Sequence, residues 1–330
     1  MESDNLENQE SFESRVDLAP LQDGVEKIKE QVGKVIVGQN RMVDLMVTAI
    51  LADGHILLEG VPGVAKTLAS KLLAKCISVD FSRIQFTPDL MPSDVLGTSV
   101  FNMKTSEFEF RKGPVFSNMV LIDEINRAPA KTQAALFEVM EERQVSIDGH
   151  TYLMEPPYIV LATQNPIEQE GTYRLPEAQL DRFLFKIEIN YPSLDDETEI
   201  LKRAAGRKGT QLDVIKSVLN AKDIKKYRSI LEDILVDEKL LAYIAQIVHN
   251  TRQDPSIYLG ASPRASLALL NGSKAFAAIQ GRDFVTPDDI KFLASPVLKH
   301  RIQLTPEKEM EGNTVDEIID QLVAKIEVPR

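Results

Sequence analysis

The sequence predicts an α/β domain built on a parallel sheet, followed by a smaller all-helical domain. First, a short apolar run at residues 55–59 leads through a glycine-bearing turn into a helical pattern over residues 68–77. Second, the apolar runs at residues 119–122 and 158–163 both end in polar residues, as buried parallel strands do where they approach a site. Third, the spacing of apolar residues is helical from residue 195 onward.

The composition is that of a soluble globular protein. The 330 residues allow two domains, each with its own core, and 43% are apolar while 27% are charged. The single cysteine, Cys76, cannot form an intrachain disulfide, which is typical of a reducing compartment. We expect a cytoplasmic protein, because the sequence has no apolar run that could span a bilayer and an acidic N-terminus unlike a secretion signal. The net charge of −12 disfavours binding of DNA through the whole surface.

The segment before the first predicted strand is acidic and then helical. Residues 1–18 carry six carboxylates and few apolar residues, so a disordered tail is expected. Apolar residues at helical spacing predict helices over 21–31 and 41–53, and Gly54 ends the second.

The stretch from Gly60 to Thr67, GVPGVAKT, lies between a strand and a helix, which is the context of a phosphate-binding loop. Gly60 and Gly63 let the backbone approach a phosphate, and the free amides at the helix start attract the anion. We expect Lys66 to reach the β- and γ-phosphates of ATP, and Thr67 to place its hydroxyl on Mg²⁺. The other expected contacts of the loop are Val61, Pro62, Val64 and Ala65.

Ala65 departs from the general pattern of this loop, which has glycine at that position. Alanine fits there if its φ is negative and is strained if its φ is positive. The effect of Ala65 on hydrolysis therefore stays open. An ordinary strand–turn–helix link is the alternative to phosphate binding, but the strand, the loop, the Lys-Thr pair and the helix together favour a phosphate site.

Carboxylates follow a second buried strand. Met119 to Glu124 is an apolar run that ends in Asp-Glu, and this end lies at the sheet edge where the phosphate loop is expected. Asp123 is expected to hold Mg²⁺, and Glu124 to orient or deprotonate the attacking water. The alternative is an acidic strand end that is solvated or paired with Arg127.

A polar amide ends another strand. The run at residues 158–163 stops at Gln164-Asn165-Pro166, so Asn165 is expected near Asp123. An uncharged amide there can hold a water near the γ-phosphate without repelling it. The alternative is a simple Asn-Pro turn.

The remaining predicted elements complete both domains. In the α/β domain they are strands at 82–86 and 183–189, hairpins at 98–115 and 144–157, and helices at 131–143 and 176–182. The hairpin at 98–115 either packs on the domain or reaches a substrate, and the sequence favours neither. Tyr191-Pro192 marks a domain boundary. The helices after it are predicted at 195–205, 237–253, 262–280, 287–300 and 314–326.

Together these motifs resemble the MoxR family of AAA+ ATPases over about residues 20–330. The resemblance is carried by residues 37–39, 58–67, 121–129, 162–166, 175–183 and 260–264. It implies a P-loop AAA+ core with a five-stranded parallel sheet over residues 19–191 and a smaller helical lid over 192–330. It also implies an insert in helix 2 at about 98–115, a hairpin before sensor 1 at about 144–157, and an adenine site at Val37 and Gly38.

The resemblance assigns further roles. Asn165 resembles sensor 1, Arg182 resembles the arginine finger that completes a neighbouring subunit's site, and Arg264 resembles sensor 2, which reaches the nucleotide from the lid. Arg174 is the second candidate for the contact between subunits. Proteins of this family usually form rings of six and hydrolyse ATP with Mg²⁺ to remodel or mature a partner protein, often one with a von Willebrand A domain.

Two other functions are weighed against this chaperone-like one. A nucleic-acid motor related to the MCM helicases would need basic residues on its hairpin, and residues 144–157 contain no Lys or Arg. A nucleotide-dependent switch with slow turnover is supported by Ala65 alone and opposed by Glu124, Asn165 and Arg182. Nucleic acid is therefore not an expected partner.

Overall fold

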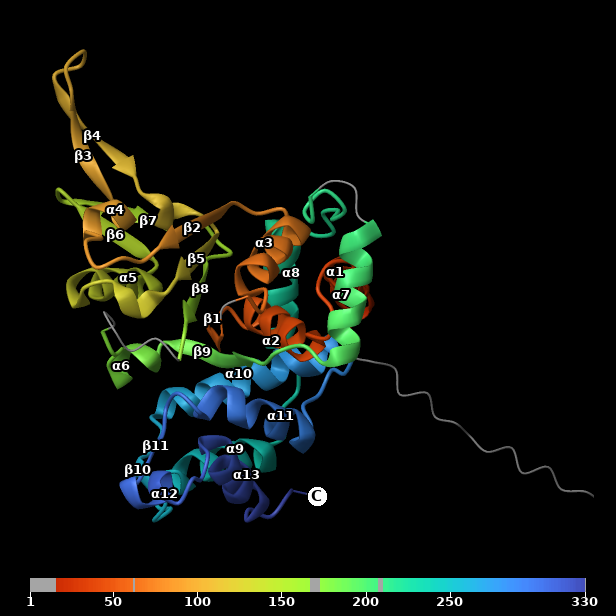
Figure 1. Ribbon diagram of the computed structural model, residues 1–330. Coiled ribbons are helices and arrows are strands. Elements are labelled where there is room, and N and C mark those ends of the chain that lie inside the picture. The colour runs from red at the N-terminus through yellow and green to blue at the C-terminus, as the bar shows by residue number, and fades with distance from the viewer. Residues whose placement is uncertain (1–15, 62, 167–172, 207–209, 330) are drawn as a thin grey trace, which may run out of the picture.

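The computed structural model describes residues 16–61, 63–166, 173–206 and 210–329 (Figure 1). Residues 1–15 of the predicted tail and Pro62 of the predicted loop lie outside these ranges. The fold centres on a parallel sheet of five strands in the order β2-β5-β8-β1-β9, which confirms the predicted sheet. Its strands are β1 (His55–Gly60), β2 (Phe81–Gln85), β5 (Met119–Asp123), β8 (Ile159–Gln164) and β9 (Phe183–Ile189).

The two faces of this sheet belong to separate buried clusters, because successive strand residues point to opposite sides. Ile56 and Leu58 pack with helices of one face, which are α1 (Ala19–Gly33), α2 (Asn40–Leu51) and α3 (Lys66–Ile77). Leu57, between them, belongs to the other cluster together with Leu136 of α5 (Ala130–Glu142). The result is a three-layer arrangement in which the carboxyl ends of all five parallel strands lie at the same edge of the sheet.

Two antiparallel hairpins extend this domain, and both were predicted. One pairs β3 (Gly97–Asn102) with β4 (Glu107–Lys112) and projects far from the body of the molecule (Figure 1). The other pairs β6 (Gln144–Ile147) with β7 (His150–Leu153) through Asp148 and Gly149, which both have positive φ, as a two-residue hairpin turn requires. The short elements between strands are α4 (Pro92–Leu96), η1 (Pro114–Phe116), η2 (Ile125–Arg127) and α6 (Glu177–Leu180).

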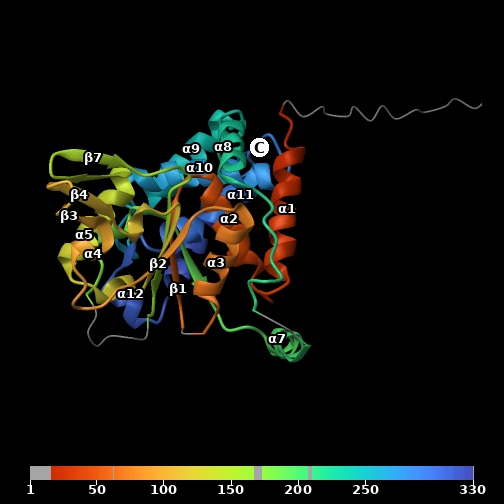
Figure 2. The ribbon, with the colours of Figure 1, turned by 90° about the horizontal axis from the view of Figure 1, so that it is seen from above.

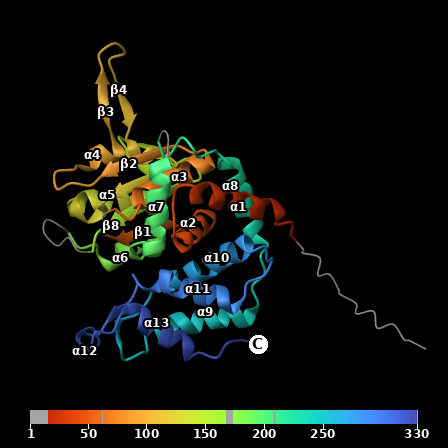
Figure 3. The same ribbon diagram turned by 45° about the vertical axis from the view of Figure 1, so that its right-hand side comes forward.

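The C-terminal part is helical. Its first two helices lie beside the α/β domain, and the later ones lie below the sheet (Figure 3). Its helices are α7 (Leu194–Gly206), α8 (Ala221–Glu232), α9 (Glu238–Asn250), α10 (Pro263–Ile279), α11 (Pro287–Leu298), α12 (Pro306–Met310) and α13 (Val315–Ala324). Helix α7 stands apart from the rest (Figure 2). The short strands β10 (Ile257–Leu259) and β11 (Gln303–Leu304) pair with each other and were not predicted. Within the described residues, none of the helices has the length and hydropathy needed to cross a membrane.

The lid continues the hydrophobic core of the α/β domain. Helix α10 packs against α2, and α11 packs against β9. Arg228 of α8 donates hydrogen bonds to the carbonyl oxygen of Ile50 at 2.7 and 3.1 Å and pairs with Asp53 at 2.5 Å. The C-terminal helices therefore meet the α/β domain through both apolar and charged contacts.

Candidate functional site

The loop between β1 and α3 is shaped by two glycines. A Cβ atom on Gly60 would lie 2.6 Å from the carbonyl oxygen of Ile189, so only glycine fits beside β9. Gly63 has a φ of 91°, which glycine adopts readily and other residues rarely do. Packing against β9 thus requires glycine at position 60, and the turn of the loop favours glycine at position 63.

Ala65 has the strained conformation that the sequence left open. Its φ is 64° and its ψ is 20°, which is the left-handed region. For a residue with a Cβ atom this costs roughly 1–2 kcal/mol relative to the right-handed helix. The departure from glycine therefore has a physical consequence at the first turn of α3.

The ammonium of Lys66 lies over the mouth of the loop. Its Nζ donates to the carbonyl oxygen of Gly60 at 2.5 Å and to that of Gln164 at 3.5 Å. These two carbonyls end the neighbouring strands β1 and β8. Lys66 therefore lies where its charge can meet a phosphate bound at this edge.

Asp123 and Thr67 face each other across this edge. The Oγ1 of Thr67 lies 3.4 Å from both carboxylate oxygens of Asp123, and Thr163 donates to the same carboxylate at 3.2 Å. Only 6% of Asp123 is exposed. A buried carboxylate beside a hydroxyl supplies the hard oxygen ligands that Mg²⁺ prefers, so the residues present fit this ion.

Arg83 of β2 also reaches Asp123 and was not among the predicted site residues. Its Nε lies 2.5 Å from Oδ2 of Asp123, and about half of its side chain is exposed. The contact arises because β2 pairs with β5 in parallel, with Gln85 beside Asp123. The sequence shows both strands but not that they are neighbours, so nothing in it indicates this pair.

Glu124 is held by two side chains. It accepts a hydrogen bond from Nε2 of Gln85 at 2.7 Å, and Nε of Arg127 lies 3.2 Å from its carboxylate. Its own N–H donates to Oγ1 of Thr163 at 2.9 Å. The pairing with Arg127 that the sequence offered as an alternative is thus present, and Gln85 is a contact that the sequence did not indicate.

Asn165 completes this edge of the sheet. It directly follows β8, which lies between β5 and β1, and only 7% of it is exposed. The structure therefore brings five predicted residues to the same edge, namely Lys66, Thr67, Asp123, Glu124 and Asn165.

The predicted arginines lie elsewhere. Arg182 directly precedes β9, so it lies at the opposite edge of the parallel sheet from the loop after β1. It pairs with Glu141 at 2.8 Å, and Arg264 of the lid pairs with the same carboxylate. Arg174 is 82% exposed and lies 3.7 Å from Glu177. Arg182 thus has a carboxylate partner within its own chain.

The predicted adenine site borders a cavity. Gly38 has a φ of 73° and lines a space of about 720 Å³ together with Tyr191 and Phe292. Asp196 of α7 packs against Gly38, and Arg203 of the same helix donates to the carbonyl oxygen of Gly33 at 2.6 Å. Helix α7 therefore covers the segment on which the adenine is expected to rest.

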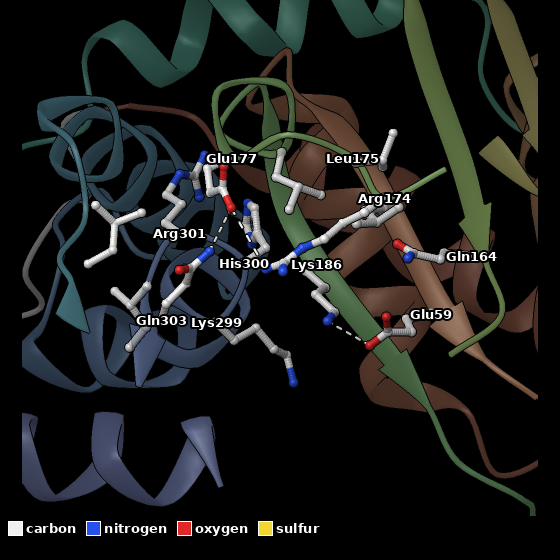
Figure 4. Close-up of a pocket in the computed structure, with 14 residues that line it drawn as sticks. Glu59, Gln164, Arg174, Leu175, Glu177, Lys186, Lys299, His300, Arg301 and Gln303 are labelled. Carbon is white, nitrogen blue, oxygen red and sulfur yellow. Dashed lines mark hydrogen bonds and ion pairs between the residues drawn. The ribbon is translucent and has the colours of Figure 1, made fainter. Parts of the chain in front are cut away.

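A second cleft of about 190 Å³ lies between the sheet and the lid (Figure 4). Its cations have carboxylate partners: Lys186 pairs with Glu59 at 2.6 Å, and Arg174 lies near Glu177. His300 is buried at its wall and makes a 3.0 Å hydrogen bond through Nε2 to the carbonyl oxygen of Phe183. The hydrogen bond of His300 connects the lid to β9, whereas both ion pairs lie within the α/β domain.

Comparison with known proteins gives consistent results. The family model described as "ATPase family associated with various cellular activities (AAA)" matches residues 55–185, and the model of the AAA lid domain matches residues 249–322. The chain is 47% identical to the uncharacterized protein YeaC of Bacillus subtilis, covering 95% of this chain and 96% of that one. It is 43% identical to Chaperone MoxR1 of Mycobacterium tuberculosis, covering 91% and 81%. A crystal structure described as a candidate ATPase, from Cytophaga hutchinsonii, has a TM-score of 0.86 and 43% identity, covering 94% and 96%.

Proposed function

The chain belongs to the MoxR family of AAA ATPases, and from this premise we propose that it hydrolyses ATP in order to remodel or mature a partner protein. The observation that carries the proposal is the meeting of Lys66, Thr67, Asp123 and Glu124 at one edge of the sheet. Each has the chemistry that phosphoryl transfer to water needs. The chaperone name of one relative supports the wider role.

Each residue of this edge has a proposed task. The loop amides and Lys66 bind the phosphates, while the adenine rests on Val37 and Gly38. Thr67 and Asp123 would hold Mg²⁺, which when bound supplies positive charge beside the phosphates. Asn165 holds the attacking water, and Glu124 accepts its proton once the carboxylate is free of Gln85 and Arg127.

Assembly into a ring is part of the proposal. Arg182 and Arg264 lie far from the loop of their own chain, so they can serve a nucleotide only if it is bound to another copy. A homo-oligomeric ring, with six subunits as is usual in the family, provides such a neighbour. We divide each subunit into a nucleotide-binding domain up to Tyr191 and a lid from Pro192 onward, and we place the protein in the cytoplasm.

The client is proposed to be a protein. The β3–β4 hairpin carries exposed Phe101 and Phe108 at its outer half, which suits contact with an apolar protein segment. A partner with a von Willebrand A domain is one candidate on the family's pattern. A nucleic-acid motor has less support, because Arg143, the basic residue closest in sequence to the β6–β7 hairpin, is paired with Asp53 at 2.8 Å.

A slow nucleotide-dependent switch is the second candidate, and the positive φ of Ala65 is the observation that favours it. In this alternative, strain at the first turn of α3 holds the loop in a conformation that binds ATP but hydrolyses it slowly. Steady-state phosphate release by the unmodified chain separates the two functions, since a switch binds ATP without sustained release.

The proposal is tested by two substitutions with a matched control. Lys66→Ala should weaken binding of a fluorescent ATP analogue sharply without unfolding the chain. Glu124→Gln should leave that binding intact and lower steady-state phosphate release by about 10²-fold or more, as loss of a general base does. Lys71→Ala, one turn further along α3, is the control and should change neither. Unchanged affinity in Lys66→Ala would refute the phosphate site, and unchanged release in Glu124→Gln would assign the base to another residue.

A further inference from the structure

One carboxylate joins two arginines that come from different parts of the chain. Glu141 lies at the end of α5 and pairs through one oxygen with Arg182, which precedes β9, and through the other with Arg264, at the start of α10 in the lid. We propose that Glu141 is a positioning residue, which gathers Arg182 and Arg264 into a single anion site for the phosphates of a nucleotide held by a second copy of the chain. This inference rests on the proposed function.

The ion pairs leave hydrogen-bonding capacity on both arginines. Arg182 meets Glu141 through Nε, at 2.8 Å, and Arg264 meets it through Nη2. A guanidinium has five N–H donors in a fixed fork, so a pair made through one nitrogen leaves the remaining donors for another anion. The ring of Phe137 lies 6.0 Å from the guanidinium carbon of Arg182 and supports its plane.

Arg182 and Arg264 both meet Glu141, and two guanidinium groups brought together in this way repel each other unless a carboxylate lies between them. Glu141 compensates one of the two charges and leaves a net positive site. A neighbouring carboxylate strengthens the arrangement: Asp181 accepts hydrogen bonds from Ser262 and Arg301, both at 2.8 Å. Asp181 precedes Arg182, and Ser262 caps the helix that carries Arg264, so both arginine backbones are tied to the same point.

The site is accessible to another molecule. About a third of the Glu141 side chain is exposed, as are 29% of Arg182 and 48% of Arg264. The three residues line a cavity of about 270 Å³ between α5, the start of β1 and α10. Each residue is therefore held by the fold and also reachable from outside, as a contact between subunits requires.

The first test compares two adjacent glutamates. Glu141→Gln removes the charge and keeps the shape, and we expect kcat for phosphate release to fall about 10- to 100-fold, the range for a displaced catalytic group. The affinity of the variant for a fluorescent ATP analogue should stay within about twofold, because its own phosphate loop is intact. Glu141→Asp, which keeps the charge, should recover part of kcat. Glu142→Gln, the same change one residue along α5 at an exposed position, should behave as the unmodified chain.

The second test distinguishes action on a neighbour from action within the subunit. Lys66→Ala chains have a defective loop and an intact arginine site, whereas Glu141→Gln chains have the reverse. In mixed rings some intact loops face an intact arginine site, so mixing should restore part of the phosphate release, as it should for Arg182→Ala mixed with Lys66→Ala. A local folding defect in Glu141→Gln would not be rescued in this way.

If the unmodified chain releases no phosphate, the proposed function fails and this inference fails with it. If the unmodified chain is active and Glu141→Gln matches Glu142→Gln in kcat, only the inference is overturned. Absence of rescue, with mixed rings shown to form, overturns it as well and moves the contact between subunits to Arg174. If Glu141→Gln does not fold, two other variants decide the matter. The inference is overturned if Glu141→Ala has an unimpaired kcat, or if mixing with Lys66→Ala chains does not rescue Glu141→Asp.

Discussion

Arg83 places a positive charge beside the carboxylate that is expected to hold the metal ion. Its guanidinium lies 2.5 Å from Asp123 and must share this carboxylate with Mg²⁺ or leave it. Asp123 is buried, but the Arg83 end of the pair is about half exposed and screened by solvent, so the pair is expected to contribute at most about 1 kcal/mol. Arg83→Gln should therefore lower the Mg²⁺ concentration for half-maximal phosphate release by up to about fivefold. The measurement is a Mg²⁺ titration of phosphate release, with fluorescent ADP binding as a second readout. Arg111→Gln on the exposed β4 strand is the control, and a higher Mg²⁺ requirement in Arg83→Gln would show that Arg83 assists the ion.

Ala65 is strained in the folded chain, so its replacement by glycine should stabilise the protein. Relief of the left-handed alanine contributes roughly 1–2 kcal/mol, and the greater freedom of glycine in the unfolded chain removes about 0.4–1 kcal/mol of it. We expect Ala65→Gly to raise the free energy of unfolding in urea by about 0.5–1 kcal/mol. Ala134→Gly in α5, at an exposed position within a helix, should change it in the opposite direction by a similar amount. A loss of stability in both variants would mean that Ala65 is not strained.

At the scale of single elements, the strands of the sheet and most helices could be predicted, because their apolar periods are long and regular. Helix α8 was missed, although Asn220 and Asp223 form a capping box and Ile224, Tyr227 and Leu231 follow at helical spacing. That signal was present in the sequence. The pairing of β2 with β5 had no such signal, since neighbours in a parallel sheet are set by the tertiary fold.

The same distinction explains which parts of the site were predicted. Lys66, Thr67 and Asp123 belong to local motifs, so their chemistry follows from spacing alone. The contact of Arg83 with Asp123 and the shared contact of Arg182 and Arg264 with Glu141 join segments that are distant in sequence. Such contacts are determined by how the elements pack against one another, and this packing cannot be predicted from the local pattern of a single sequence.

The β3–β4 hairpin is anchored at one end and free at the other. Phe110 packs against Tyr152 with ring centroids 4.4 Å apart. Phe101 and Phe108 meet edge to face with ring centroids 5.3 Å apart, and they are 50% and 72% exposed. The base of this hairpin therefore packs on the domain, as one interpretation of the sequence predicted, and contact of its outer half with a substrate stays a prediction.

Replacement of the exposed aromatic pair tests its role. Phe101→Ser with Phe108→Ser should leave basal phosphate release within about twofold, because the pair lies away from the nucleotide edge. It should remove the aromatic part of the apolar surface that the hairpin offers to a client. In the Glu124→Gln background, which should retain a client with ATP, the amount of co-purified protein should fall. Tyr258→Ser is the control, an equally exposed aromatic on β10 of the lid. Equal retention with and without the two phenylalanines would exclude the hairpin as the client contact.

At the scale of the whole molecule, we expect stability to depend on pH through two buried histidines. His55 joins three elements, because Val160 donates to its Nδ1 at 3.0 Å and its Nε2 donates to the carbonyl oxygen of Met140 at 3.0 Å. Burial lowers the pKa of His55 to about 4, and Arg143 adds to this effect. Burial and Arg301 lower the pKa of His300 well below 6.5. Both imidazoles therefore stay neutral in the folded chain over a range in which the unfolded chain binds protons.

The direction of the pH effect follows from these lowered values. As the pH falls below about 6.5, the unfolded chain takes up a proton on each histidine and the folded chain does not, so the unfolded state gains stability. Each histidine should lower the free energy of unfolding by up to about 1.4 kcal/mol per pH unit, until the pH reaches its folded pKa. Urea unfolding at pH 7, 6 and 5 measures this slope. His55→Gln and His300→Gln should each reduce it, whereas His150→Gln, at an exposed position on β7, should leave it unchanged. If all three variants keep the slope of the unmodified chain, other groups cause the loss of stability and the two buried histidines are not its source.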